Sequence, residues 1–338
     1  MTTRVGFFGG GFIANYHGKM LHTSGADASI VAVHDPDEAK ADAFARASGA
    51  FPVPSEQELI DRVDAVYVCT WTAEHPRLVA LVAQAGLPVF CEKPLATNVD
   101  DARGMVDVVT RTGVVNQVGL VLRDSPAFLL LKHLIARPES GRVMSVVFRD
   151  DQFIPIQGMY ASDWRVEPDK VGAGTLIEHS IHDLDLLEFL LGPAVSVSGR
   201  SAEFHQHDGI EDVVVATLAF ESEALATLTS IWHDVVERPS LRHVEVFCEN
   251  AYFVLEGDHL GPVRWTRSGD GHGALDGGEL IEELQHHGVD LRNPDHAFIQ
   301  AVQTNAPAYP DFAEALRAHV LTDAIYRSAS AGGTSIDV

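Results

Sequence analysis

The chain has 338 residues, of which 46% are hydrophobic, and a formal net charge of −24. This length suits about two domains of ~150 residues each. The negative charge argues against nucleic acid and anionic membrane surfaces as partners, because both attract Lys- and Arg-rich surfaces. Cys69, Cys91 and Cys248 are far apart in the sequence, so we expect buried thiols and no disulfide or zinc set. We recognise no signal peptide and no apolar run of ~18 residues, so we expect a soluble cytoplasmic protein.

A glycine-rich turn follows the first expected strand, residues 4–8, and a helix is expected over about residues 14–21. The turn has the spacing G-x-G-x-x-A. Glycine permits a tight turn and close approach of the backbone to a pyrophosphate at a helix N-terminus. The residues predicted to bind a dinucleotide here are Gly9, Gly11, Phe12, Ile13 and Ala14. The alternative is an ordinary tight turn between a strand and a helix.

Asp35 ends the second expected strand, residues 29–34. An acidic residue about 20 positions beyond the glycines accepts hydrogen bonds from the ribose hydroxyls of NAD. It would repel the 2′-phosphate of NADP, and no Arg stands beside it. We therefore expect NAD as the cofactor, with NADP disfavoured. The alternative role of Asp35, an N-cap for a helix beginning at Pro36, is compatible with the first.

Helices and buried strands alternate through the rest of the first half. The expected strands are residues 52–53, 64–70, 87–91 and 113–119, and the expected helices are 38–48, a helix capped by Ser55, a helix ending at Gly86, and 97–112. This alternation predicts a doubly wound parallel sheet, a Rossmann domain over residues 1–122. We expect Thr70, the last residue of the strand over residues 64–70, and Trp71 and His75, in the loop after it, to contact the cofactor.

The strand over residues 87–91 stops at Glu92-Lys93-Pro94. Proline has no N–H for the ladder and keeps the preceding residue out of the α region, so the strand must end here. Ligands of open α/β sheets bind at this carboxyl edge. We therefore predict that Glu92, Lys93 and Pro94 lie beside the cofactor. By itself, Lys93 could equally be a solvated surface charge.

The second half, residues 123–338, is expected to be an α+β domain with a large, mostly antiparallel open sheet, because alternating strands dominate it. The expected strands are residues 143–150, 195–203, 212–220, 224–233, 244–248 and 251–255, and the expected helices are 126–137, 175–191, 295–304 and 311–330. Residues 258–294 are expected to form loops with one short helix.

The helix expected over residues 175–191 carries Glu178 and His182 four positions apart, which would place both on one helical face. A carboxylate beside an imidazole is a common arrangement for orienting a general base. The alternative is a polar helix face with ordinary side-chain pairing. E-x-x-x-H differs from the zinc motif H-E-x-x-H and no third ligand follows, so no metal is expected.

These motifs together resemble the Gfo/Idh/MocA family of glucose–fructose oxidoreductase and inositol dehydrogenase-like proteins. The resemblance covers nearly the whole chain. It rests on Gly9-x-Gly11-x-x-Ala14, Glu92-Lys93-Pro94, Arg123-x-x-Pro126, Trp164-Arg165, the Gly172–Gly174 cluster and Ile181-His182-Asp183-Leu184-Asp185. Where the family usually has Asp, then an apolar residue and Gly, this chain has Glu178, His179 and Ser180.

The resemblance implies an oxidoreductase that moves a hydride between NAD and a secondary hydroxyl or ketone of a sugar, cyclitol or glycoside. It implies that Lys93 and His182 flank the reacting carbon, with Glu178 completing the set. His182 would take the hydroxyl proton, and Lys93 would donate a hydrogen bond to the developing alkoxide. The residues expected around the substrate are Arg123, Trp164, Arg165, His179 and His182. For His179, a structural role is the alternative.

Two other functions are compatible with the same motifs. One is an NADPH-dependent ketosugar reductase, against which Asp35 argues. The other is a nonenzymatic dinucleotide-sensing regulator, which would have no need for both Lys93 and His182. The resemblance also implies a homodimer or homotetramer formed through the sheet of the second domain. No motif identifies the polyol.

Overall fold

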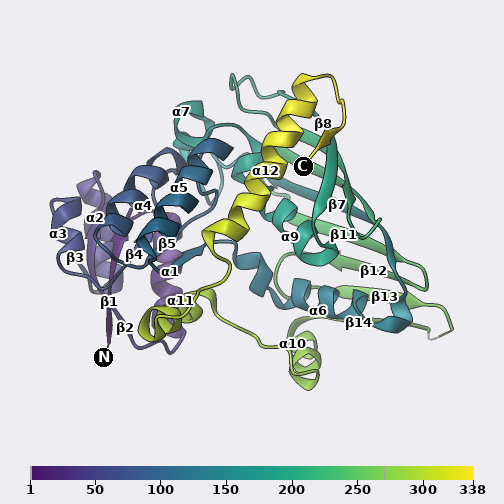
Figure 1. Cartoon of the computed structure of the whole chain (residues 1–338), viewed down its shortest axis with the longest axis horizontal. Coiled ribbons are helices and arrows are strands. Elements are labelled where there is room, and N and C mark those ends of the chain that lie inside the picture. The colour runs from purple at the N-terminus through teal and green to yellow at the C-terminus, as the bar shows by residue number, and fades with distance from the viewer. Residues whose placement is uncertain (1, 270) are drawn as a thin grey trace. The chain divides into compact units, whose positions relative to one another are not determined.

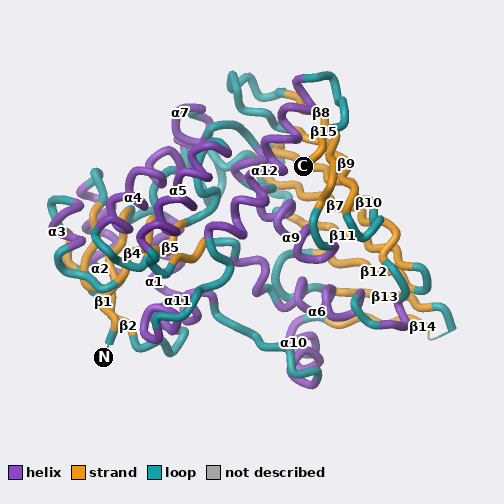
Figure 2. Tube along the Cα trace, viewed as in Figure 1, coloured by secondary structure: helices purple, strands orange, loops and turns teal. Residues whose placement is uncertain are grey.

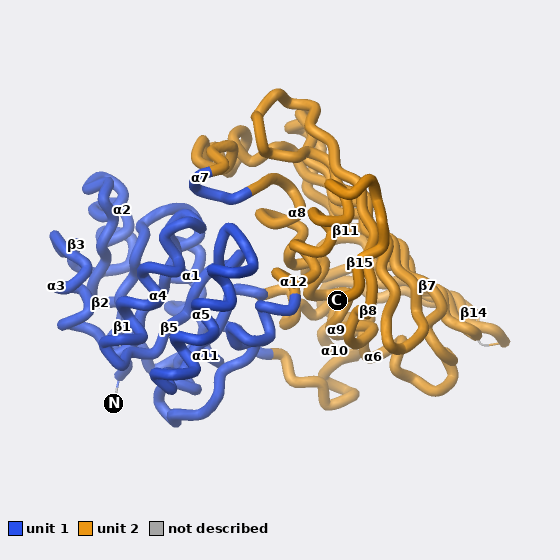
Figure 3. The backbone as a smooth tube through the Cα atoms, turned by 45° about the horizontal axis from the view of Figure 1, so that its top comes forward, with its two compact units in different colours: residues 1–120, 169–172, 292–317 blue, residues 121–168, 173–291, 318–338 orange. Residues whose placement is uncertain are grey.

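The computed structural model describes residues 2–269 and 271–338. The chain divides into two compact units (Figure 3). The first unit comprises residues 1–120, 169–172 and 292–317, and the second comprises residues 121–168, 173–291 and 318–338. Residues 169–172 and 292–317 therefore belong to the first unit, whereas the domain boundary predicted after residue 122 assigned both segments to the second domain.

The first unit contains a six-stranded sheet in the order β3-β2-β1-β4-β5-β6, with every neighbouring pair parallel. The strands are β1 (Thr3–Phe8), β2 (Ala28–His34), β3 (Phe51–Pro52), β4 (Ala65–Val68), β5 (Val89–Cys91) and β6 (Asn116–Val118). This confirms the predicted doubly wound sheet. The strand order reverses at β1, and ligands of such sheets bind at the carboxyl ends of the strands beside this reversal.

Helices complete the first unit. They are α1 (Phe12–Thr23), α2 (Glu38–Ser48), α3 (Glu56–Ile60), the 3₁₀ helix η1 (Thr72–Glu74), α4 (His75–Gln84), α5 (Val99–Thr112), α7 (Pro168–Val171) and α11 (Pro294–Thr304). Because successive strand residues point to opposite faces, the sheet contributes side chains to two apolar clusters, one on each face. Phe298 and Ile299 of α11 fill one cluster and Phe312 fills the other. This burial explains why the late segment returns to the first unit.

The second unit contains a nine-stranded sheet in the order β14-β13-β12-β11-β7-β10-β9-β8-β15 (Figure 1). The strands are β7 (Val143–Phe153), β8 (Ala194–Ala202), β9 (Val213–Phe220), β10 (Leu225–His233), β11 (Leu241–Cys248), β12 (Ala251–Glu256), β13 (Val263–Arg267), β14 (Gly271–Leu275) and β15 (Ile336–Asp337). Only the central pair β7 and β10 is parallel among these strands. The predicted mixed, mostly antiparallel sheet is confirmed.

Helices of the second unit cover one face of this sheet (Figure 2). The helices of this unit are η2 (Val121–Asp124), α6 (Pro126–Ile135), η3 (Pro138–Ser140), η4 (Asp163–Val166), α8 (Thr175–Glu178), α9 (Ile181–Leu191), α10 (Gly277–His286) and the C-terminal part of α12 (Phe312–Ser330), and those that pack against the sheet through the apolar cluster are α6, α8, α9, α10 and α12. On the opposite face, Val147, Leu225 and Phe247 are 38%, 58% and 39% exposed. Within the described ranges, no helix is both long and apolar enough to cross a membrane.

Two expectations about the second half are wrong. Residues 258–294 hold the β13–β14 hairpin as well as α10, because strand pairing with β12 orders sequences that lack clear apolar alternation. The helix expected over residues 175–191 is two helices, α8 and α9, separated at His179 and Ser180. The Ser180 hydroxyl donates to Ser230 Oγ at 2.6 Å, and the Ser180 N–H bonds to the Thr175 carbonyl at 2.9 Å, which interrupts the regular helical pattern.

Candidate active site

The glycine turn joins β1 to α1 in the first unit. Gly9 has φ +91°, and an added Cβ would lie 2.5 Å from the Cys69 carbonyl oxygen, so glycine is required there. A Cβ at Gly11 would meet no atom within 4 Å. Gly11 is also the N-cap of α1, which has no side-chain cap and no acidic residue in its first turn. The helix N-terminus is therefore available to an anionic group.

The Asp35 carboxylate lies at the end of β2 beside this turn. It accepts hydrogen bonds from the Gly10 N–H and the Asp37 N–H, both at 2.8 Å. The N-cap of α2 is Asp37, whose side chain accepts from the Ala39 and Lys40 N–H groups. Asp35 as the helix N-cap is therefore wrong, because its carboxylate is held against the glycine turn instead.

The loop after β4 is tied to the Glu92-Lys93-Pro94 segment through His75. The buried His75 ring has Nδ1 2.9 Å from the Pro94 carbonyl oxygen and Nε2 3.2 Å from the Thr70 carbonyl oxygen. The Lys170 ammonium lies 5.2 Å from the centre of the Trp71 ring. The predicted residues of this loop therefore share one carboxyl edge of the sheet with Lys93.

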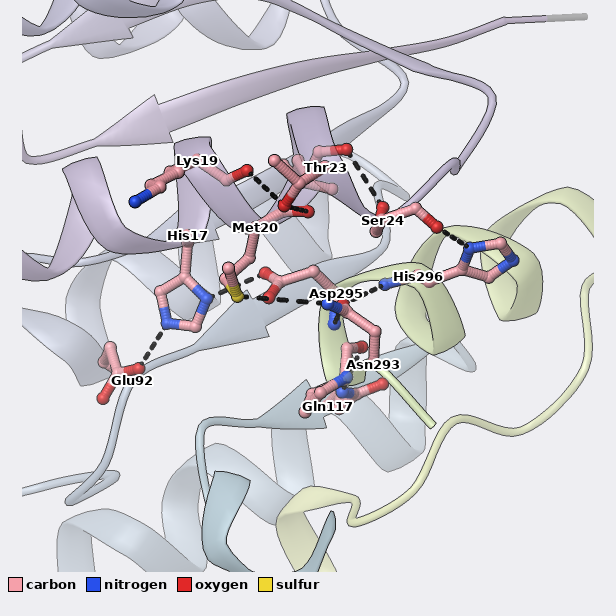
Figure 4. A network of polar contacts seen from close by, with 12 residues as sticks. His17, Lys19, Met20, Thr23, Ser24, Glu92, Gln117, Asn293, Asp295 and His296 are labelled. Atoms are coloured by element: carbon pink, nitrogen blue, oxygen red, sulfur yellow. Dashed lines mark hydrogen bonds and ion pairs between the residues drawn. The ribbon is translucent and has the colours of Figure 1, made fainter. Parts of the chain in front are cut away.

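Glu92 is buried at the end of β5 and contacts a histidine that the sequence analysis did not single out. Its Oε1 lies 2.7 Å from His17 Nε2, and its Oε2 accepts the Lys93 N–H at 3.0 Å. His17 Nδ1 lies 2.8 Å from Asp295 Oδ1 (Figure 4). Burial by itself lowers the pKa of His17, but Asp295 and Glu92 outweigh that effect and raise the pKa to about 10.

In the second unit, Glu178 ends α8 and is buried. Its Oε1 lies 3.1 Å from Arg165 Nε, and the Arg165 guanidinium lies over the rings of Tyr160 and Trp164, at 5.6 Å and 5.2 Å from their centres. Three predicted residues, Trp164, Arg165 and Glu178, are thus in one group. Glu178 and His182 do not share a helical face, because the helix is interrupted between them.

A buried charge cluster lies beside the joint between α8 and α9. Arg242 of β11 reaches Asp183 Oδ1 at 2.6 Å, Asp150 Oδ2 at 3.0 Å and Asp258 Oδ2 at 2.9 Å. His179 Nε2 also lies 2.9 Å from Asp150 Oδ2. Burial raises the pKa of Asp183 to about 8, with Arg242 opposing the rise and Asp150 adding to it. His179 is therefore part of the cluster that fixes the start of α9, where His182 lies.

Arg123 makes a buried two-point ion pair with α9. Its Nε and Nη2 donate to Asp185 Oδ2 and Oδ1 at 2.8 and 2.6 Å. Both side chains are only 3% exposed. This contact fixes α9 one turn beyond His182, and a contact of Arg123 with substrate stays a prediction.

The structure also identifies supporting residues that sequence reasoning missed. Glu211 accepts the Gly174 and Leu176 N–H groups at 2.6 and 3.0 Å and the Tyr326 hydroxyl at 2.9 Å, so it caps the start of α8 from another part of the chain. Glu211 and Arg242 have no recognisable spacing to the helices that they hold. Only the tertiary contacts reveal them.

The predicted residues divide between the two units. The glycine turn, Asp35, the loop after β4 and Lys93 belong to the first unit, which offers a helix N-terminus without a side-chain cap and a carboxylate suited to a dinucleotide. His182 and the group around Glu178 belong to the second unit, which offers an imidazole, a carboxylate and a guanidinium. These are groups suited to proton transfer and to binding hydroxyl groups.

Two family models match the chain in succession. The model described as "Oxidoreductase family, NAD-binding Rossmann fold" matches residues 3–120. The model described as "GFO/IDH/MocA C-terminal domain" matches residues 128–254. Together they cover the first sheet and most of the second.

Several characterised proteins are similar to the chain. Inositol 2-dehydrogenase of Rhizobium meliloti is 28% identical over 97% of both chains. scyllo-Inositol 2-dehydrogenase (NAD⁺) of Bacillus subtilis is 31% identical over 65% of both chains. Among solved structures, levoglucosan dehydrogenase in complex with NADH matches with a TM-score of 0.85 and 20% identity over 100% of this chain and 99% of that one, a likeness of fold.

Proposed function

The chain belongs to the Gfo/Idh/MocA oxidoreductase family, and from that premise we propose that it is an NAD-dependent dehydrogenase of a cyclitol or sugar. It oxidises a secondary hydroxyl group or, in reverse, reduces the ketone. Similarity to inositol dehydrogenases over nearly the whole chain supports this substrate class. The observation that carries the proposal is that Lys93 follows the carboxyl end of β5, on the edge of the sheet where β1 leads into the glycine turn and β2 ends before Asp35.

The first unit binds NAD. Backbone N–H groups at the start of α1 receive the pyrophosphate, and Gly11 leaves space for it. The Asp35 carboxylate accepts hydrogen bonds from the adenosine ribose and repels the 2′-phosphate of NADP. Thr70, Trp71 and His75 line the same edge near Pro94. When bound, NAD supplies a hydride acceptor.

The reaction needs a proton acceptor and a stabiliser of negative charge on oxygen. His182 takes the proton from the substrate hydroxyl. Lys93 donates a hydrogen bond to that oxygen as it becomes negative. In ketone reduction the same groups act in reverse.

Glu178 and Arg165 form an ion pair in the part of the site that binds the substrate. The longer side chain of Glu, compared with the family's usual Asp, reaches Arg165 and neutralises a cation that is only partly exposed. Arg165 and Trp164 contact substrate hydroxyl groups and ring faces. His179 and Arg123 support His182 through their contacts with Asp150 and Asp185.

The test of this function is a screen of NAD and NADP reduction with inositols, aldoses and glycosides, followed by the Lys93→Met variant on the best substrate. We expect turnover with NAD, and a loss of kcat of about 100- to 1,000-fold in the variant, the usual cost of removing one oxyanion donor. The Kd for NAD should change little. Equal turnover by Lys93→Met, or inactivity of the wild type with every compound, would contradict the proposal.

We also propose that the protein works in the cytoplasm as a homo-oligomer. The exposed outer face of the second sheet supports this assembly, because Leu225 and Phe247 flank Ser145 of β7 in register and Val147 lies two residues further along. Exposed apolar side chains gathered on one face are typical of protein–protein contacts.

A further inference from the structure

A buried three-residue chain of side chains links the glycine-turn helix to the Glu92-Lys93-Pro94 segment. His17 comes from α1, Glu92 from the end of β5 and Asp295 from the first turn of α11 (Figure 4). All three lie in the first unit. His17 is fully buried, and Glu92 and Asp295 are 6% and 1% exposed. Such a group is costly to bury unless each charge is paired.

The contacts define the protonation of this group. Each ring nitrogen of His17 lies within 2.8 Å of a carboxylate oxygen, and an ionised carboxylate only accepts hydrogen bonds. His17 must therefore donate from both nitrogens, which makes it an imidazolium. The raised pKa of His17, and the lowered pKa of Glu92, where His17 and Lys93 outweigh burial, agree with this assignment.

The Glu92 carboxylate, which His17 holds in place, also contacts the backbone of Lys93. Its second oxygen accepts the Lys93 N–H at 3.0 Å, so the carboxylate fixes the peptide from which the Lys93 side chain departs. Gly119, directly after the neighbouring strand β6, makes room for this carboxylate, because an added Cβ would lie 2.5 Å from Glu92 Oε1. The Glu92 carboxylate is therefore fixed by His17 and by the Lys93 N–H, in a space that Gly119 leaves open.

We propose that His17 and Asp295 are positioning residues, which hold the Glu92 carboxylate and through it set the direction of the Lys93 side chain. This inference rests on the proposed role of Lys93. The contacts that join Asp295 to Lys93 run through His17 and the Glu92 carboxylate. Misplacing a catalytic group by about 1 Å costs up to about 100-fold in rate.

The test uses Asp295→Asn, which is almost isosteric, and His17→Gln. The matched control is His296→Asn, since His296 is the next residue on α11 and also joins α11 to α1, through the Ser24 carbonyl at 2.9 Å, but does not contact Glu92. We expect kcat to fall about 10-fold in Asp295→Asn and about 100-fold in His17→Gln, with the KM for NAD within about 3-fold of wild type. His296→Asn should keep wild-type kcat.

Two measurements on the cofactor-free protein complete the test. ¹⁵N-histidine NMR at pH 8 should show His17 as an imidazolium, and this signal should vanish in His17→Gln. The chain has five lysines, so the ¹³C resonance of reductively methylated Lys93 can be assigned with Lys93→Met. That resonance should move in Asp295→Asn and stay in place in His296→Asn.

Several outcomes overturn the proposal. These are a neutral His17 at pH 8, wild-type kcat in folded Asp295→Asn, or an equal loss in His296→Asn, which would indicate a general packing effect of α11. If Lys93→Met is inactive while the Asp295 and His17 variants are fully active, only the positioning role fails. If Lys93→Met itself is fully active, the proposed function fails first.

Discussion

His17 carries its charge in a fully buried position between two carboxylates. Its pKa rises from 6.5 to about 10, with Asp295 and Glu92 overcoming the opposing effect of burial. The folded state therefore binds a proton more tightly than the unfolded state. The stabilisation from this proton is fully present below pH 6.5 and is lost as the pH rises through about 10.

The stability of the wild type should consequently decrease more steeply between pH 7 and 10 than that of His17→Gln, because the variant lacks the imidazolium that loses its proton in this range. Urea midpoints at pH 7, 8.5 and 10 measure the difference. Tyr16 and Tyr67 also lie beside His17, and burial together with Asp295 raises the pKa of each hydroxyl, so these two groups titrate above their usual range. Parallel curves for the two proteins would mean that His17 does not bind this proton in the folded state.

Residues differ in how far local sequence predicts their role. Gly9 and Gly11 were predicted from spacing because a tight turn imposes its demands on neighbouring residues. His17 was not predicted, since its partners Glu92 and Asp295 lie 75 and 278 positions away. A buried histidine in a helix has no sequence signature that reveals such partners.

At the scale of elements, the joint between α8 and α9 is held by polar contacts from the sheet beneath it. Arg242 of β11 joins Asp183 of α9 to Asp150 of β7, and Ser230 of β10 accepts the Ser180 hydroxyl. The prediction of a single helix over residues 175–191 is wrong because these contacts to three strands outweigh the local helical propensity.

Arg242→Met should destabilise the protein by about 3–5 kcal/mol, because it leaves buried carboxylates without their cation. Arg238→Met is the matched control. Arg238 pairs with Asp151, the neighbour of Asp150, but its side chain is 42% exposed, so its loss should destabilise the protein much less than the loss of Arg242. Urea unfolding measures both. Equally small decreases in the free energy of unfolding of the two variants would show that the buried charge cluster around Arg242 contributes little to stability.

At the scale of the whole molecule, the outer face of the nine-stranded sheet carries the apolar side chains that we assign to self-association. Leu225→Glu combined with Val147→Glu should convert the assembly to monomers, because the charges would be desolvated in the contact. Sedimentation velocity at several concentrations measures this, with Phe51→Glu, an exposed apolar site on the first unit, as the control. An unchanged sedimentation coefficient in the double variant would place the contact elsewhere.

The division of the chain also belongs to this scale. The strand–helix alternation predicted the Rossmann sheet, and alternating strands predicted the mixed sheet that follows. The return of residues 292–317 to the first unit was not predicted. Their apolar pattern would suit a core in either unit, and only the burial of Phe298 and Phe312 identifies which one.

The sequence by itself determined the two kinds of sheet, the glycine turn, Asp35 and the strand end at Glu92-Lys93-Pro94, because each depends on periodicity or on the chemistry of adjacent residues. The tertiary structure decided where the helix carrying His182 begins, why Glu178 lies apart from it, and which side chains hold Glu92. Those features depend on contacts between residues far apart in the sequence, such as Arg242 with Asp183 and His17 with Asp295, for which local sequence carries no signal.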